Sequence, residues 1–431
     1  MAEQTCGVCH AREVARVARA PMATLRGLIA VDLWAFGEQE FPDGEETVEA
    51  ILNDEYPTLA RDHLRRLCLG CHLRTRRGNR DDAIPPDAGS GCGACHTAAR
   101  PAGGEEGHSD VIGVPDDGRC FGCHSRSGRI SLTDQGLAEV SGPWAEACRD
   151  RSSLADGRGV CRIPADVHQE AGMGCVDCHL HTELMGDSAS YAHQEEAVEI
   201  TCELCHGPVP YGAERTWFDV WDPVTQALLR LRNASRFDTE AVRVTKRGTP
   251  VWNLRPGRGA SAGTWVLERK RDPGVVLPVT PTPEDVTHRV WGHERVSCAA
   301  CHAAAAPTCP TCHTSFDATG EQWDFGAGGM RPGMWVETSR GVGFAPPRMA
   351  VGGDGRIRPA IPGMTAELDA RAAGGPRRHV QLFSVLDPHN TRRAARECAS
   401  CHGDPGVFME GSGTRRGARS LTAPARGSRR G

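Results

Sequence analysis

Apolar positions follow a helical period in only two short stretches, both near the start of the chain. The first contains Val48, Ile51 and Leu52, and the second, beyond Pro57, contains Leu59, Leu64 and Leu67. Residues at these separations share one face of a helix. We expect two short helices, separated at Pro57 because proline removes a backbone donor.

Two long stretches, residues 207–297 and 314–397, contain patterns of another kind. β-Branched and aromatic residues cluster between glycine-rich turns at residues 242–245, 264–267 and 335–338. Such clusters favour short strands. We expect small β insertions in both stretches, and a disordered linker is the alternative.

The composition indicates that side chains alone do not fill the interior. Aromatic residues make up only 5% of the 431 residues, which include 51 glycines and 29 prolines, and the mean hydropathy is −0.41. Either much of the chain is loop or a bound group occupies the core.

Charge and hydropathy exclude some classes of protein. The formal net charge of −5 does not suggest nucleic-acid binding. The absence of an apolar run of about 20 residues predicts no transmembrane helix. Residues 411–431 contain six arginines and no acidic residue, so we expect a disordered basic tail, which could alternatively touch an acidic partner.

Cysteine supplies the strongest signal, because 18 of the 20 cysteines stand in nine Cys-x-x-Cys-His motifs, called here the first to the ninth. In chain order these are Cys6-Gly-Val-Cys9-His10, Cys68-Leu-Gly-Cys71-His72, Cys92-Gly-Ala-Cys95-His96, Cys120-Phe-Gly-Cys123-His124, Cys175-Val-Asp-Cys178-His179, Cys202-Glu-Leu-Cys205-His206, Cys298-Ala-Ala-Cys301-His302, Cys309-Pro-Thr-Cys312-His313 and Cys398-Ala-Ser-Cys401-His402. Their irregular spacing excludes a fixed-period repeat.

This spacing is typical of covalently attached haem c. Two thiols separated by two residues can bond the two vinyl groups of one porphyrin, and the following histidine then binds the iron. A zinc site needs four ligands, usually from two paired knuckles, and does not need His after every second Cys. A redox Cys-x-x-Cys would be expected once. We therefore expect nine haems c, with short helices and irregular chain packed around them.

Cys148 and Cys161 belong to no motif. In an oxidising compartment they would most simply form a disulfide that closes a short loop, and two buried thiols are the alternative.

The nine histidines outside the motifs equal the number of haems. Those predicted as second axial ligands are His63, His108, His168, His193, His288, His293, His379 and His389. His181 is the weakest candidate, because it stands two residues after His179. Ligation by two histidines gives low-potential iron suited to carrying electrons, whereas Met raises the potential. Met173, Met185 and Met364 are lesser candidates, with packing as the alternative.

The motifs divide the chain into expected regions. These are residues 1–206 with six motifs, a β-containing insertion at 207–297, a close haem pair at 298–313, a β and loop insertion at 314–397, the last haem at 398–410 and the basic tail at 411–431. Haem c is attached outside the bacterial cytoplasm, so we expect a periplasmic or extracellular protein. The sequence shows no signal peptide before Cys6, and we expect a truncated or misassigned start, or a mature form.

From Cys6 to His402 the chain resembles the large multihaem c-type cytochromes of anaerobic respiration. Besides the motifs, Asp166-Val167-His168 leading to Gly172-Met173-Gly174-Cys175 is similar to a segment of such proteins in which the histidine is a distal ligand. The resemblance implies a secreted, loop-rich protein built around closely spaced haems. It also implies redox partners, namely a quinol-linked membrane donor and another cytochrome or a terminal reductase.

Two functions remain open on the sequence. An electron carrier is favoured, since nine haems in 431 residues must lie close together. The alternative is a reductase or oxidase with one open-faced haem that acts on a small oxyanion, nitrogen or sulfur compound, with Arg162 as a candidate catalytic group. The Cys-x-x-Cys-Lys motif of pentahaem nitrite reductases is absent, and no tyrosine matches the cross-linked tyrosine of hydroxylamine-oxidoreductase-like enzymes.

Overall fold

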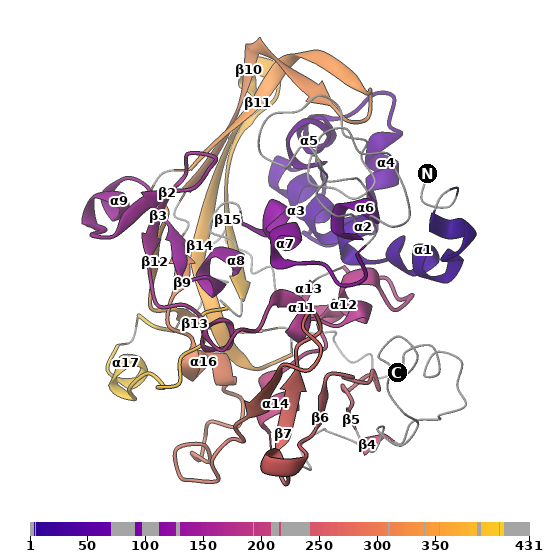
Figure 1. The fold of residues 1–431 in the computed structure, drawn as a ribbon. Coiled ribbons are helices and arrows are strands. Elements are labelled where there is room, and N and C mark those ends of the chain that lie inside the picture. Colours follow the sequence, from indigo (N-terminus) through magenta and orange to yellow (C-terminus); the bar gives the residue numbers. More distant parts are fainter. Residues whose placement is uncertain are drawn as a thin grey trace, which may run out of the picture.

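A computed structural model gives the fold of the chain (Figure 1). It describes residues 4, 6–69, 91–96, 112–125, 130–192, 194–207, 215–216, 242–308, 311–339, 341–352, 354–385, 389–404 and 406–408. His72, His108, His193, Cys71, Cys309 and the basic tail lie outside these residues.

The N-terminal part is helical, as the apolar spacing predicts. Its elements are α1 (Ala11–Val17), α2 (Pro21–Thr24), α3 (Arg26–Phe36), α4 (Val48–Leu52), α5 (Leu59–His63) and a π-helical turn, η2 (Leu64–Cys68). Thr58 caps α5, because its hydroxyl accepts a hydrogen bond from the backbone N–H of Arg61 at 3.5 Å. The two predicted helices are confirmed as α4 and as α5 with η2.

A five-stranded sheet forms the largest β element. Its strands are β10 (Thr311–Asp324), β11 (Gly329–Ser339), β13 (Arg348–Val351), β14 (Ile357–Asp369) and β15 (Arg377–Val385). The order is β11–β10–β14–β13, and β15 also pairs with β14. β10 and β14 run parallel, while the other pairs are antiparallel.

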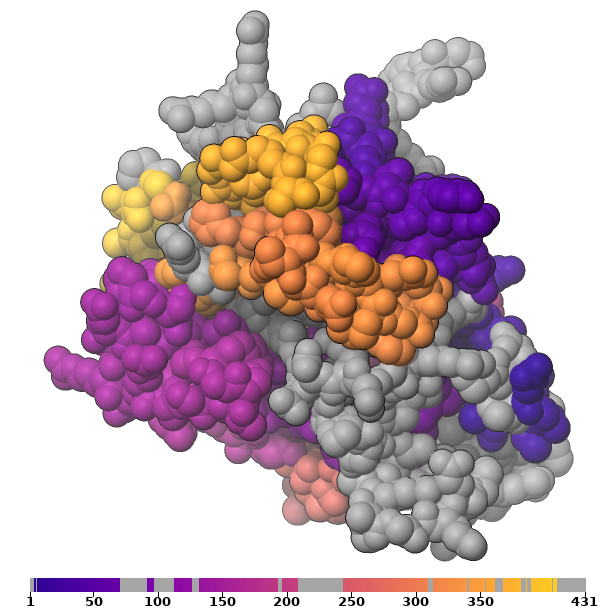
Figure 2. Space-filling view, turned by 90° about the horizontal axis from the view of Figure 1, so that it is seen from above, coloured from indigo at the N-terminus to yellow at the C-terminus, as the bar shows by residue number. Residues whose placement is uncertain are grey.

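The largest apolar core lies between this sheet and the N-terminal helices. Ile29, Ile51 and Leu64 pack there with Trp335, which is 1% exposed. The indole Nε1 of Trp335 donates a hydrogen bond to Asp62 at 2.8 Å, which satisfies its buried N–H. Seen from above, the orange and yellow strands form a ridge beside the indigo N-terminal helices (Figure 2).

Three smaller sheets surround the motif region. One contains β1 (Leu137–Glu139), β2 (Arg151–Ser153) and β3 (Gly159–Arg162). The second contains β6 (Leu254–Pro256), β7 (Trp265–Glu268) and β8 (Val276–Val279). The third pairs β9 (Ala306–Thr308) with β12 (Gly343–Ala345). A short pair joins β4 (Arg215–Thr216) to β5 (Val242–Arg243). Residues 264–267 lie mainly in β7, and residues 335–338 lie within β11. Strands are therefore confirmed in both segments.

The expected fold is only partly right. Helix accounts for 32% and strand for 24% of the structure, so short helices and small sheets are confirmed, and together they make up slightly more than half of it. The stretch from 314 to 397 is not a small insertion, because it supplies most of the five-stranded sheet. The β1–β3–β2 sheet, between the fourth and fifth motifs, was not expected. Across the described residues, no helix combines the length and hydropathy needed to span a bilayer.

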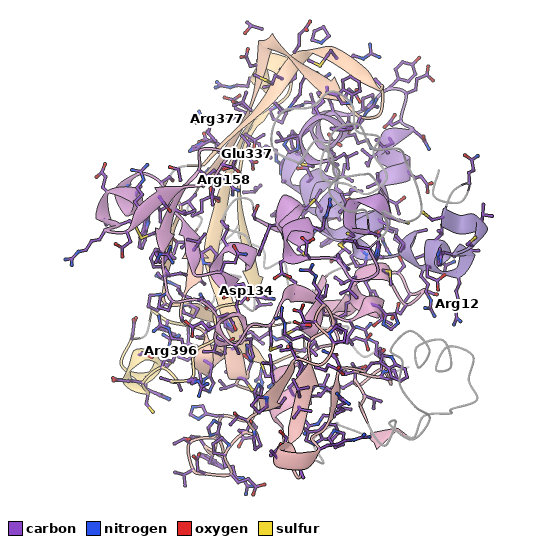
Figure 3. All side chains as sticks on the ribbon, viewed as in Figure 1. Arg12, Asp134, Arg158, Glu337, Arg377 and Arg396 are labelled. Carbon is purple, nitrogen blue, oxygen red and sulfur yellow. A yellow bond between two sulfur atoms is a disulfide. The ribbon has the colours of Figure 1, made fainter. Side chains whose placement is uncertain are left out.

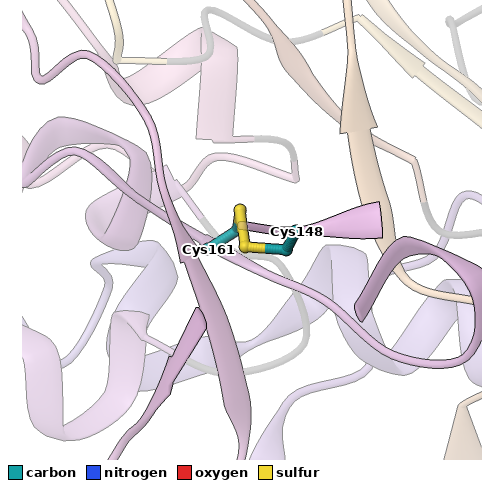
Figure 4. Close-up of a disulfide and its surroundings, with 2 residues drawn as sticks. All are labelled: Cys148 and Cys161. Carbon is teal, nitrogen blue, oxygen red and sulfur yellow. A yellow bond between two sulfur atoms is a disulfide. The ribbon is translucent and has the colours of Figure 1, made fainter. Parts of the chain in front are cut away.

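The two cysteines outside the motifs form a disulfide (Figure 4). Their Cα atoms lie 5.9 Å apart. The bond links Cys161 on β3 to Cys148, which follows α9 (Pro143–Ala147). The expected pairing is therefore confirmed.

Replacing both Cys148 and Cys161 with alanine should lower the free energy of unfolding by about 3 kcal/mol, because the disulfide closes a loop of 13 residues. Urea unfolding followed by circular dichroism measures the change. All nine motifs remain in this variant, so the visible absorbance of attached haem serves as the control. Unchanged stability of the variant would contradict the stabilising role.

Candidate functional site: motif turns and histidine pairs

Seven of the nine motifs lie on single helical turns. They are carried by η1 (Cys6–Val8), α6 (Gly93–His96), α7 (Asp117–His124), α11 (Cys175–Cys178), α14 (Cys202–His206), α16 (Cys298–His302) and α17 (Ala399–His402). In the third motif the backbone N–H of His96 donates to the carbonyl of Cys92 at 2.9 Å. Because side chains three and four residues apart share one face of a turn, both thiols and the imidazole of a motif lie on one side.

Neighbouring polar residues fix where these turns begin. The hydroxyl of Thr201 accepts from the N–H of Leu204 at 3.2 Å, and that of Ser297 accepts from the N–H of Ala300 at 3.2 Å. Serine and threonine at this position stabilise a helix start. The sixth and seventh motifs are therefore set in their turns by the residue before the first cysteine.

The second and eighth motifs differ from the others. Cys68 ends the π-helical turn η2, and the rest of the second motif lies outside the described residues. In the eighth motif, His313 lies on strand β10 rather than on a helix. Only part of these two motifs lies within the described residues. The other seven motifs show how the thiols and imidazoles are arranged.

Among the described residues, four pairs of imidazole rings lie close together, and their ring planes are nearly parallel, at 13°, in two pairs and tilted in the other two. Each pair joins the histidine of a motif to a histidine from another part of the chain. The ring centres are 5.9 Å apart for His168 and His206, 6.0 Å for His179 and His389, 6.3 Å for His288 and His302, and 5.9 Å for His293 and His402.

These separations fit two imidazoles on opposite sides of one metal. A metal–imidazole bond is about 2 Å long and each ring centre lies about 1 Å beyond its nitrogen, so two such centres stand about 6 Å apart. The residues of the fifth, sixth, seventh and ninth motifs therefore fit a haem held by two cysteines and two histidines.

Many of these histidines are oriented through Nδ1. Three of them bond a backbone carbonyl: His96 that of Ile112 at 3.0 Å, His206 that of Thr280 at 2.6 Å, and His302 that of Arg392 at 2.9 Å. Four others pair with a carboxylate: His179 with Glu183 at 2.9 Å, His313 with Glu367 at 2.8 Å, His168 with Asp166 at 2.7 Å, and His288 with Asp285 at 3.1 Å. A bond at Nδ1 fixes the ring and leaves Nε2 as the nitrogen that faces a metal.

His389 is held in an uncommon backbone conformation. Its φ angle is +48°, in the left-handed region that residues other than glycine rarely adopt. The next residue, Asn390, is 1% exposed, and its side chain bonds the backbone of Ala304 and Ala305. Strained conformations of this kind concentrate at functional sites. Asn390 therefore fixes the loop that presents His389 to His179.

His63 is buried in the main core. Its Nδ1 lies 3.1 Å from Asp32, while Nε2 is buried without a hydrogen-bond partner in the described structure. Burial lowers the pKa of His63, but the Asp32 carboxylate outweighs it, so the pKa is raised. An unsatisfied buried nitrogen fits a ligand role. Ligation by His63 stays a prediction, since His72 lies outside the described residues.

Sequence proximity does not give the correct partners. His168 shortly precedes the fifth motif but faces His206 of the sixth, and His389 precedes the ninth but faces His179 of the fifth. His288 and His293 both shortly precede the closely spaced seventh and eighth motifs, and His288 faces His302 of the seventh. His293 faces His402 of the ninth motif.

The remaining candidates lie outside these pairs. His379 and His313 both stand opposite Glu367 in the strand register, so they share one face of the sheet and do not face each other. His181 begins α12 (His181–Met185), and burial lowers its pKa. Met173 packs against Leu180 and Leu204, which is the packing alternative. Arg162 is exposed at the end of β3.

Asp134, labelled in Figure 3, ends α8 (Ile130–Asp134) near α7 of the fourth motif and His179 of the fifth. Burial raises the pKa of this carboxyl to about 7, and the carboxylates of Asp166 and Asp117 add to the shift. No local pattern in the sequence marks Asp134, because its pKa shift comes from residues that only the fold brings together.

Comparison with known proteins returned no match: no protein-family profile, no curated protein and no solved structure resembles the chain significantly.

In the haem-loaded protein, His389→Ala should open one iron, because it removes the ring opposite His179. The reduced variant should then bind one more carbon monoxide than the wild type, as measured by visible difference spectra. Arg393→Ala, an exposed change in the same segment, is the matched control and should bind no more than the wild type. An unchanged His389→Ala spectrum, or equal binding by both variants, would contradict the assigned pairing.

Asp134→Asn should raise the melting temperature at pH 8 and change it little at pH 4. The pKa of Asp134 is about 7 in the folded protein and 3.8 ordinarily. Between pH 3.8 and pH 7 the carboxyl therefore takes up a proton when the chain folds. The free energy of unfolding therefore falls as pH rises through this window, and asparagine removes the loss. Melting curves at both pH values test this, and equal shifts at pH 4 and pH 8 would count against it.

Proposed function

We propose that the chain is a multihaem c-type cytochrome that carries electrons between redox partners. The observation that carries the proposal is the set of four imidazole pairs, each of which joins a motif histidine to a histidine outside the motifs. Iron held by two histidines supplies one-electron chemistry at low potential.

The residues of this chain perform three tasks in such a protein. Paired thiols on one helical turn would anchor the group, and the two imidazoles of each pair would bind its iron. Carboxylates and carbonyls at Nδ1 orient the rings, among them the carboxylates beside His179 and His168. An iron bound by both imidazoles would have no site for a substrate, which favours a carrier over a reductase at these four motifs.

The setting outside the cytoplasm rests on two features. Haem c attachment belongs there, and the bond between Cys148 and Cys161 fits an oxidising compartment. The proposed partners are one-electron proteins, a quinol-linked donor on one side and another cytochrome or a terminal reductase on the other.

The test uses the chain produced in a host that attaches haem c. The mass of the denatured protein should show nine haems, and the native protein should exchange electrons with a small reduced cytochrome. It should not turn over nitrite, hydroxylamine or tetrathionate with a dye as donor. Absence of attached haem would overturn the proposal, and turnover of one of these compounds would favour the reductase.

A further inference from the structure

Among the described residues, the motif helices lie beside one another in the order in which they occur along the chain. At the N-terminal end, Cys92 interacts electrostatically with Cys6, so the first motif adjoins the third. Helix α6 of the third motif contacts α7 of the fourth, and Cys95 interacts electrostatically with Cys120. The first, third and fourth motifs are therefore consecutive neighbours.

The fourth motif adjoins the fifth through three contacts. α7 packs against α11, and the backbone N–H of Cys175 donates to Asp117 at 2.9 Å. The thiols of Cys120 and Cys175 also share a hydrogen bond.

The fifth, sixth and seventh motifs continue the series. Leu180, next to the fifth motif, and Leu204, within the sixth, share one apolar cluster on the β6–β7–β8 sheet. The thiols of Cys202 and Cys298 share a hydrogen bond. In addition, Arg356 forms an ion pair of 2.7 Å with Glu203 and lies near Cys298. The sixth motif is therefore a neighbour of both the fifth and the seventh.

The seventh motif adjoins the ninth. The backbone N–H of Arg396 donates to the carbonyl of Cys301 at 2.9 Å, and Ala300 and Cys401 pack in one cluster. A single loop also supplies both distal histidines, since His288 faces His302 and His293 faces His402.

The two ends of this series lie on opposite sides of the molecule. Helix α1 directly follows the first motif, and α17 carries the ninth; Figure 1 shows them at opposite edges. Figure 3 labels Arg12 in α1 and Arg396 before α17 at these two places. Cys6, Cys9 and His10 are exposed at one end, and Cys398 and His402 at the other.

We propose that the first, third, fourth, fifth, sixth, seventh and ninth motifs form one linear file of attachment sites whose two ends are docking points for one-electron carrier proteins. The inference rests on the proposed function and adds the order of the sites and the places where partners bind. One electron enters from a reduced carrier protein at one end and one leaves to an oxidised carrier protein at the other, so the chain is unchanged after each transfer.

An experimental structure of the holoprotein, by electron cryo-microscopy or crystallography, tests the order directly. Each haem is assigned to its motif by its thioether bonds. Nearest neighbours in the order first, third, fourth, fifth, sixth, seventh, ninth are expected, and any other order among these seven overturns the inference. Loss of the haems themselves would instead overturn the proposed function, so the two failures are distinguishable.

A matched pair of variants tests continuity. Cys120→Ser with Cys123→Ser removes an interior site, whereas Cys398→Ser with Cys401→Ser removes a terminal one. Each protein is tethered to an electrode through a tag at its N-terminus, next to the first motif, and the reducible haem is measured by absorbance.

The interior variant should lose fast reduction of the four sites beyond the break, which belong to the fifth, sixth, seventh and ninth motifs. The terminal variant should keep fast reduction of all its remaining haems. Equal behaviour of the two variants, each with eight attached haems, overturns the linear file.

Discussion

The structure depends on one recurrent interaction, in which the histidine of a motif faces a second histidine from outside the motifs, with ring centres about 6 Å apart. A single turn places two thiols and one imidazole on the same side, and the fold must then deliver the second ring. Placing the second ring strains the backbone at His389, which adopts a left-handed φ of +48°. Buried Asn390 holds the loop that contains it. Asp166 serves two segments, since it bonds His168 and also the N–H of Thr391 at 2.6 Å.

This constraint explains an unusual core. The main apolar cluster lies away from most motifs, between the N-terminal helices and the five-stranded sheet. Around the motifs the apolar clusters are small, and polar contacts such as that of Lys270 Nζ with the carbonyl of His179 at 3.0 Å join the segments. A chain with 5% aromatic residues can form such a fold if bound groups supply the missing apolar volume.

Local features of the fold were predictable, whereas long-range ones were not. The spacing of Leu59 and Leu64 gave a helix, and the leftover Cys148 and Cys161 gave a disulfide. The long strand β14 was missed because Pro362 and Gly363 interrupt its pattern, and both fall in a register shift that the sheet tolerates. Likewise the candidate ligands were recognised, but their partners depend on chain crossings that no local pattern encodes.

The most direct measurement of the central claim is low-temperature electron paramagnetic resonance of the oxidised, haem-loaded protein. The paired histidines require low-spin iron at the fifth, sixth, seventh and ninth motifs, because each has two strong axial ligands. The account predicts low-spin signals for at least these four sites. High-spin signals from more than five irons would contradict it, because at least one of these four sites would then be high-spin.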